Sequence, residues 1–137
     1  MSQQNVEIVR ELMALRERAL ESGEPTTHTD LLAPDFEIDL SRRVFNPAVY
    51  HGIDGVARLN DEIRDVWEEF RVVPEQFIDA GDRVVVMEKV RGRGRSSGVE
   101  VETPTYATIW TLRDGRATRV QVAVDPNEAL KAVGLEE

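Results

Sequence analysis

The sequence has 137 residues, of which 41% are hydrophobic and 31% charged, and its formal net charge is −9. These values predict one soluble globular domain over residues 1–137, and the negative charge argues against a nucleic-acid partner, which would need a positive surface. Cysteine is absent and there are two histidines, which excludes a disulfide, a thiolate nucleophile and a centre of three histidines from one chain. We expect neither a metal nor a cofactor.

No run of apolar residues is long enough to span a membrane, and the N-terminal segment lacks the basic and apolar regions of a signal peptide. We therefore expect a cytoplasmic protein without a membrane partner. Small molecules and other proteins remain as partners.

Apolar residues at helical spacing predict a first helix over residues 3–22, which Gly23 ends. Arg16 lies within the apolar stripe of this helix. Either its methylene groups cover the core while the guanidinium reaches solvent, or the guanidinium lines a pocket as a ligand-binding residue.

A short second helix is predicted over residues 26–32, followed by a half-buried strand in which apolar and acidic residues alternate. The apolar set, Phe36, Ile38 and Leu40, should face the helices. Asp39 then points to the opposite face unless a bulge intervenes.

An irregular loop over residues 41–52 leads into the longest amphipathic helix, predicted over residues 53–69 with Trp67 in its buried stripe. Tyr50 and His51 lie at the entry to this helix, near the expected mouth of a cavity. We name both as candidate ligand contacts, although a histidine at such a place is more often simply exposed.

Four strands with tight turns between them are predicted over residues 71–79, 83–95, 99–113 and 116–124. Asp125 and Pro126 then start a C-terminal helix of about eight residues. The order of elements predicts an α+β fold: a curved antiparallel sheet wrapped round three N-terminal-side helices, with a short C-terminal helix.

Glu88 is the sharpest irregularity in the chain, because it shares a strand phase with Val84, Val86 and Val90. A carboxyl group inside the cup would be desolvated and its pKa raised, which suits an acid or a base. The alternatives are an ion pair with a buried arginine such as Arg16, or burial of the other strand phase.

The register of the hairpin over residues 83–113 decides what lies beside Glu88. Pairing Arg95 with Glu100 sets opposite charges together at the tip and leaves Glu88 opposite Ala107. Pairing Arg95 with Val99 puts Glu88 opposite Tyr106 instead.

A one-residue bulge near Gly92 and Gly94 would allow both pairings, the first at the tip and the second deeper down. Glu88 then shares the cavity face with three further side chains: Tyr106, Thr108 and Trp110. In this arrangement Glu88, Tyr106 and Thr108 are candidate catalytic residues, and Trp110 is a candidate ligand contact.

The local motifs also resemble a known family. The matching stretches are NVEIVREL, LLAPDFEI, YHGIDGVARL, EQFIDAGDRVVV, VRGRGRSSGVEVE, ATIWTLRDGRATRV and DPNEALKAVGL. They resemble the SnoaL-like group of the nuclear transport factor 2-like superfamily, with its ketosteroid isomerases and polyketide cyclases. The resemblance implies a cone-shaped α+β barrel, often dimeric through the sheet.

The catalytic residues of these relatives do not carry over intact. Ketosteroid isomerases use an aspartic acid in the oxyanion hole, an aspartate base and a tyrosine donor. By the resemblance, the aspartic acid corresponds to a position near Thr108, the base to Leu40 or Asp39, and the tyrosine to Arg16 or Glu17. Cyclases and epoxide hydrolases have a late aspartate near Val122. The fold therefore carries more of the resemblance than the site does.

Two functions remain open. The first is a cofactor-free isomerase or cyclase that uses acid–base chemistry on a small apolar or polyketide-like molecule. The second is a non-catalytic ligand-binding or protein-association module. In both cases we expect a homodimer through the sheet.

Overall fold

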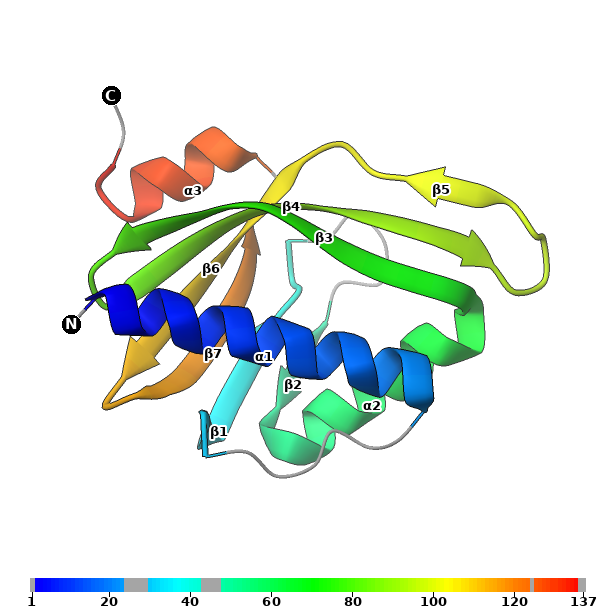
Figure 1. Ribbon diagram of the computed structural model, residues 1–137, viewed down its shortest axis with the longest axis horizontal. Helices are drawn as coiled ribbons and strands as arrows, with labels where there is room; N and C mark the ends of the chain where they lie inside the picture. Colours follow the sequence, from blue (N-terminus) through cyan, green and yellow to red (C-terminus); the bar gives the residue numbers. More distant parts are fainter. Residues whose placement is uncertain (1, 24–29, 43–47, 124, 136–137) are drawn as a thin grey trace.

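The computed structural model describes residues 2–23, 30–42, 48–123 and 125–135. Within these residues, three helices surround a bent sheet of seven strands (Figure 1). The helices are α1 (Ser2–Ser22), α2 (Gly52–Val66) and α3 (Pro126–Ala132). The strands are β1 (Leu32–Asp39), β2 (Val49–His51), β3 (Trp67–Ala80), β4 (Arg83–Gly94), β5 (Glu100–Glu102), β6 (Tyr106–Arg113) and β7 (Arg116–Ala123). The predicted α+β architecture is confirmed.

The strands follow the order β2-β1-β7-β6-β4-β3, and β5 pairs with β4. Neighbouring strands are antiparallel except β1 and β7, which run parallel. The sheet is therefore mixed, whereas the sequence predicted an antiparallel one. The side-chain pattern of a strand reports which face is buried and carries no signal for the direction of a partner distant in the chain.

Two predicted helices have different bounds in the structure. Most of the helix predicted over residues 26–32 lies outside the described residues, and Leu32 already begins β1. The long helix ends at Val66 instead of residue 69, because Trp67 is extended and pairs with Gly94 of β4. Hydrogen bonding to β4 thus takes over from helical bonding at this point.

The sheet has two differently covered faces. The inner face carries Val84, Val86 and Trp110, which pack with buried residues of α1 and α2. The outer face carries Val85 and Ile109, which pack against α3. Helices α1 and α3 accordingly lie on opposite sides of β4 in Figure 1.

The N-terminus of α3 has the predicted cap, since the Asp125 carboxylate accepts a hydrogen bond from the backbone N–H of Asn127 at 2.9 Å. No helix in the described part of the chain is long and apolar enough to cross a membrane. The homodimer through the outer face stays a prediction, which light scattering can check.

The deep register of the central hairpin is the one that sets Glu88 opposite Tyr106 and Val86 opposite Thr108. The tip register differs from this one, with Arg91 opposite Glu102 and Arg93 opposite Glu100, so the predicted pairing of Arg95 with Glu100 is wrong. Between the pairs of Glu88 and Arg91, β4 advances by three residues and the facing strands by four.

The extra residue lies in the segment between β5 and β6, which contains Pro104, and the prediction of a bulge at Gly92 and Gly94 is wrong. Proline has no N–H to donate, so it interrupts the ladder here. The hydroxyl of Thr103 accepts from the backbone N–H of Val90 at 2.9 Å and restores one lost bond.

Gly92 has a different role, because the Trp67 ring lies against it. A Cβ atom at Gly92 would stand 2.9 Å from that ring and 3.0 Å from the carbonyl oxygen of Glu69. Gly92 therefore makes room for the indole, which also packs on Phe70 with ring centroids 5.9 Å apart.

A second irregularity lies on the other side of Glu88. In β3 the register shifts between Pro74 and Gln76, and Pro74 is the residue opposite Glu88. Glu88 is thus flanked by a proline-containing irregularity in each neighbouring strand segment. Such irregularities bend a strand, and β3 is visibly curved where it passes over α1 (Figure 1).

Candidate functional site

The centre of the candidate site is the carboxyl group of Glu88, in the middle of β4. Glu88 is 3% exposed, although a glutamate with the ordinary pKa is charged at neutral pH. The Tyr106 hydroxyl donates to its Oε2 at 2.8 Å, and the Thr108 hydroxyl donates to its Oε1 at 2.8 Å. The predicted grouping of these three residues on the inner face is confirmed, while their catalytic role stays a prediction.

Trp110 fixes the direction of the hydrogen bond between Thr108 and Glu88. The indole Nε1 donates to Thr108 Oγ1 at 3.2 Å. An indole nitrogen can only donate, so Thr108 accepts from Trp110 and uses its own hydrogen toward Glu88. A chain of donors therefore runs from Trp110 through Thr108 to the carboxylate.

Burial raises the pKa of Glu88 above the ordinary glutamate value. The hydrogen bonds from Tyr106 and Thr108 and the positive charge of Arg16 oppose this effect without cancelling it. The shift moves the titration of the carboxyl group toward neutral pH, where one group can both remove and return a proton.

A pocket of about 230 Å³ opens beside Glu88. Its walls are largely apolar and come from α1 on one side and the inner face of the sheet on the other. The lining residues are Arg10, Met13, Ala14, Arg16, Glu17, Leu20, Phe70, Val72, Pro74, Phe77, Glu88, Thr108, Trp110 and Val120. Three sequence-predicted site residues besides Glu88, namely Arg16, Thr108 and Trp110, thus line the same pocket.

Arg16 is half-buried and has no hydrogen bond or ion pair within residues 2–23, 30–42, 48–123 and 125–135. Its charge acts on Glu88 without direct contact. The next residue, Glu17, is held by Arg71 at 2.9 Å. Arg16 is therefore available to whatever enters the pocket.

Tyr50 and His51 do not line this pocket. Tyr50 is 4% exposed and packs in the core, where its hydroxyl donates to Glu62 Oε2 at 2.7 Å. Gly55 lies close against its backbone, because a Cβ atom at Gly55 would stand 3.0 Å from the Tyr50 carbonyl carbon. Tyr50 thus anchors the start of α2, and its predicted ligand contact has no support in this geometry.

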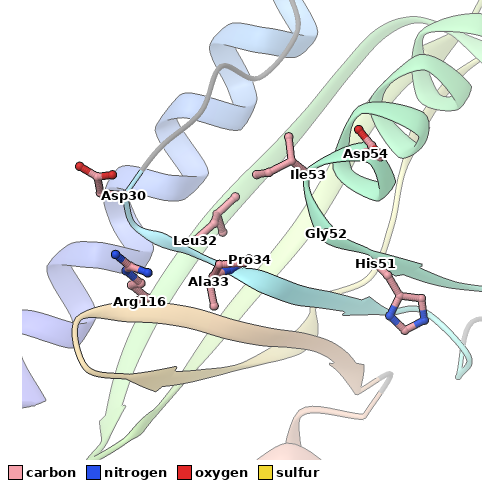
Figure 2. Close-up of a pocket in the computed structure, with 9 residues that line it drawn as sticks. All are labelled: Asp30, Leu32, Ala33, Pro34, His51, Gly52, Ile53, Asp54 and Arg116. Atoms are coloured by element: carbon pink, nitrogen blue, oxygen red, sulfur yellow. The ribbon is translucent and has the colours of Figure 1, made fainter.

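His51 lines a separate pocket of about 390 Å³ between β1, the start of α2 and the start of β7 (Figure 2). The lining residues are Asp30, Leu32, Ala33, Pro34, His51, Gly52, Ile53, Asp54 and Arg116. All four ionisable residues among them are exposed, and the His51 side chain is 71% exposed. Because none of the described lining residues is a buried polar one, this pocket is the weaker candidate despite its volume.

A second buried carboxylate lies on the outer face of the sheet. Asp39 is 7% exposed and accepts hydrogen bonds from the backbone N–H and hydroxyl of Ser41 and from the Arg119 guanidinium. Arg119 also donates to Glu37 at 3.0 Å. The bonds from Ser41 and then Arg119 hold the pKa of Asp39 below its ordinary value, against the effect of burial.

The sequence did not identify the aromatic and aliphatic side of the pocket. Phe70, Phe77 and Val120 come from strands, and their common position depends on strand order. A partial signal existed in α1, where Met13 and Leu20 lie three and four residues from Arg16 and so share its face. In the described part of the chain, no group of three or more histidine or acidic side chains is placed to hold a metal ion.

A bent sheet covered by helices on its inner face, with a buried acid beneath the first helix, defines a cone-shaped α+β protein of the nuclear transport factor 2-like class. The chain belongs to the SnoaL-like domain family, whose model matches residues 9–120. A search of functionally curated proteins gives no match.

Solved structures with this fold cover almost the whole chain. One is a hypothetical protein with a ketosteroid isomerase-like fold from Catenulispora acidiphila in complex with trimethylamine, with 19% identity and a TM-score of 0.70 over 94% of this chain and 93% of that one. TerC, co-crystallised with polyporic acid, has 24% identity and a TM-score of 0.69 over 96% and 98% of the two chains.

A putative SnoaL-like polyketide cyclase from Jannaschia has 21% identity and a TM-score of 0.64 over 98% of this chain and 94% of that one. Likeness at this level of identity shows a shared fold. It does not transfer a reaction.

Proposed function

We propose that the protein is a cofactor-free enzyme that isomerises or cyclises a small, mostly apolar, polyketide-like molecule by proton transfer. The observation that carries the proposal is the buried Glu88 carboxyl group, held by two hydroxyl donors at the wall of an apolar pocket. Such a group is expensive to bury and has a raised pKa, which is the environment that general acid–base catalysis requires.

In this proposal Glu88 removes a proton from a carbon atom of the substrate and returns it to another position. The hydrogen bonds from Tyr106 and Thr108 hold both carboxylate oxygens in place while the charge of the group changes. Trp110 contributes to the wall and orients Thr108. Each side chain has a defined orientation before the substrate binds, which lowers the barrier for the transfer.

The relatives support the class of reaction without naming the substrate. One similar structure carries the name of a putative SnoaL-like polyketide cyclase. The compounds in two others, polyporic acid and trimethylamine, differ in chemistry. The ligand must therefore be inferred from the pocket of this chain.

A non-catalytic binding module is the second candidate. It is favoured by one observation: both oxygens of Glu88 already have partners inside the protein, so the carboxyl group is satisfied without a ligand. In that function Glu88 would hold β4 to β6 and would exchange no proton with a bound molecule.

A model proton abstraction separates the two functions. The probe is 5-nitrobenzisoxazole, a small aromatic compound from which a base removes the carbon-bound proton while the nitrogen–oxygen bond breaks to give a coloured phenolate. We expect wild type to accelerate this reaction and Glu88→Gln to lose about 100-fold or more, as for removal of a general base. The matched control, Glu11→Gln on the exposed side of α1, should keep the wild-type rate.

The pH profile of this rate supplies a second readout. The base is active when ionised, so the rate should rise with pH, with its midpoint above the ordinary pKa of glutamate because the pKa of Glu88 is raised. A rate that is equal in wild type and Glu88→Gln would rule out Glu88 as the base and favour the binding module.

A further inference from the structure

We infer that the natural ligand of the Glu88 pocket is a small organic anion: one ring or two fused rings bearing a single carboxylate or enolate oxygen that Arg16 binds. The inference rests on the proposed function for the location of the site, and it adds the charge and size of the substrate. Neither the fold nor the relatives assign these.

The first argument is the isolation of Arg16. The neighbouring cations of the pocket and its rim are engaged, since Arg71 is bound to Glu17 at 2.9 Å and the Arg10 guanidinium lies 4.2 Å from the centre of the Phe77 ring. Arg16 has no such contact within the described residues, and it is half-buried. A guanidinium carries five donors in a planar fork that matches a carboxylate, so an anion is the partner that this vacant group fits.

The second argument is the balance of charge inside the pocket. Its ionisable lining residues are Arg10, Arg16, Glu17 and Glu88. With Glu17 bound to Arg71, the charge that faces Arg16 from the sheet is that of Glu88. Burial favours the protonated form of Glu88, and in that state the pocket has a positive charge that an anion neutralises.

The two residues therefore divide the contacts with the ligand. Arg16 approaches from α1, while Glu88 approaches from the sheet and, when protonated, can donate a hydrogen bond. An anionic oxygen between them would accept from both. Ionised Glu88 would repel the same anion, so binding should weaken as pH rises through the titration of Glu88, while Arg16 still holds the anion beside the ionised form that removes the proton.

The third argument is size and selectivity. A pocket of about 230 Å³ lies below the range of about 300–1,000 Å³ typical for drug-sized ligands, which restricts the molecule to one or two rings. The protein carries a net charge of −9, so its overall field repels anions. An anion that binds here must therefore be held by a local cation.

The test compares 2-naphthoate with 2-naphthamide, which share a shape and differ in charge, by titration followed through tryptophan fluorescence or calorimetry. We expect wild type to bind the carboxylate at least about tenfold more tightly than the amide, as for a charged hydrogen-bonded pair. Arg16→Gln should lose that preference. Arg18→Gln removes the same charge from an exposed position of α1 outside the pocket and should keep it.

Three outcomes would overturn the inference: equal binding of the two probes by wild type, equal losses in Arg16→Gln and Arg18→Gln, or no binding of 2-naphthoate at millimolar concentration. A pH series adds a further requirement, because the affinity for 2-naphthoate should fall with rising pH in wild type and stay flat in Glu88→Gln.

The outcome is separable from that of the proposed function. If wild type binds 2-naphthoate and 2-naphthamide equally while proton abstraction still depends on Glu88, the anionic ligand is rejected and the proposed enzyme is retained. Glu88→Gln that keeps full proton abstraction would reject the enzyme, and the preference for 2-naphthoate would then assign an anion-binding module.

Discussion

The two faces of the sheet each bury one carboxylate, and the two groups have opposite electrostatics. Glu88 on the inner face is 3% exposed and is held by hydroxyl groups, while Asp39 on the outer face is 7% exposed and is held by Ser41 and Arg119. The pKa of Glu88 is raised by burial, and that of Asp39 is lowered chiefly by its bonds from Ser41. Similar exposure therefore accompanies a raised pKa at one carboxyl group and a lowered pKa at the other.

The strongest way to test this contrast is to neutralise each carboxylate at neutral pH. Asp39→Asn should cost about 1–3 kcal/mol of the free energy of unfolding, because Arg119 and Ser41 lose a charged acceptor. Glu88→Gln should change it by less than about 1 kcal/mol, since a neutral amide can accept from Thr108 and donate to the oxygen of Tyr106.

Urea unfolding measures both values, and the exposed Asp65→Asn on α2 serves as the control for the first. If Glu88→Gln were the more damaging change, Glu88 would be a fixed structural charge like Asp39, and the contrast would fail.

A smaller effect separates the two donors of Glu88. Thr108→Val leaves both Glu88 Oε1 and Trp110 Nε1 without this partner, whereas Tyr106→Phe removes the donor to Glu88 Oε2. We expect a loss of about 1–2 kcal/mol for Thr108→Val and a smaller loss for Tyr106→Phe.

Both substitutions should raise the pKa of Glu88 further, because each removes a hydrogen bond that favours the ionised form. Carbon-13 NMR of the glutamate carboxyl groups, with Glu88→Gln to assign the signal, measures this pKa. A fall of the pKa in either variant would contradict the role of the two hydroxyls as donors.

The smallest effect is the pH dependence of stability, and its sign differs between the faces. For Glu88 the folded-state pKa is raised, so its contribution is complete below the ordinary glutamate pKa and is lost as pH rises through the folded value. For Asp39 the folded-state pKa is lowered, so its contribution is present above the ordinary aspartate pKa and is lost as pH falls through the folded value.

Stability profiles of Glu88→Gln and Asp39→Asn against pH test this difference. Relative to wild type, the first variant should improve as pH rises and the second should improve as pH falls. Profiles that stay parallel to wild type would show that neither pKa is shifted by folding.

The inner face was largely predictable from the sequence, and the outer cluster was not. Glu88 stood out because the apolar phase of one strand contains it, and local pairing in the adjoining hairpin then placed Tyr106, Thr108 and Trp110 beside it. Asp39 meets Arg119 across a parallel pair of strands 80 positions apart. No local pattern encodes such a contact.

The errors have local physical causes. Pro104, within a strand predicted as continuous, indicated that the ladder breaks there. The bulge was instead expected at Gly92 and Gly94, which lie in the opposite strand. Tyr50 was expected at the cavity mouth because of its place in the chain, yet its ring is buried in the core and its hydroxyl reaches Glu62. Sequence position did not indicate which way that side chain turns.

The donor order from Trp110 to Thr108 to Glu88 also closes a route. For a proton to leave Glu88 through Thr108, the threonine would have to pass its own hydrogen to the indole nitrogen, which cannot accept one. Proton transfer from Glu88 through Thr108 to Trp110 is therefore not possible. A proton taken up by Glu88 must leave toward Tyr106 or directly into the pocket, because the indole blocks the route through Thr108.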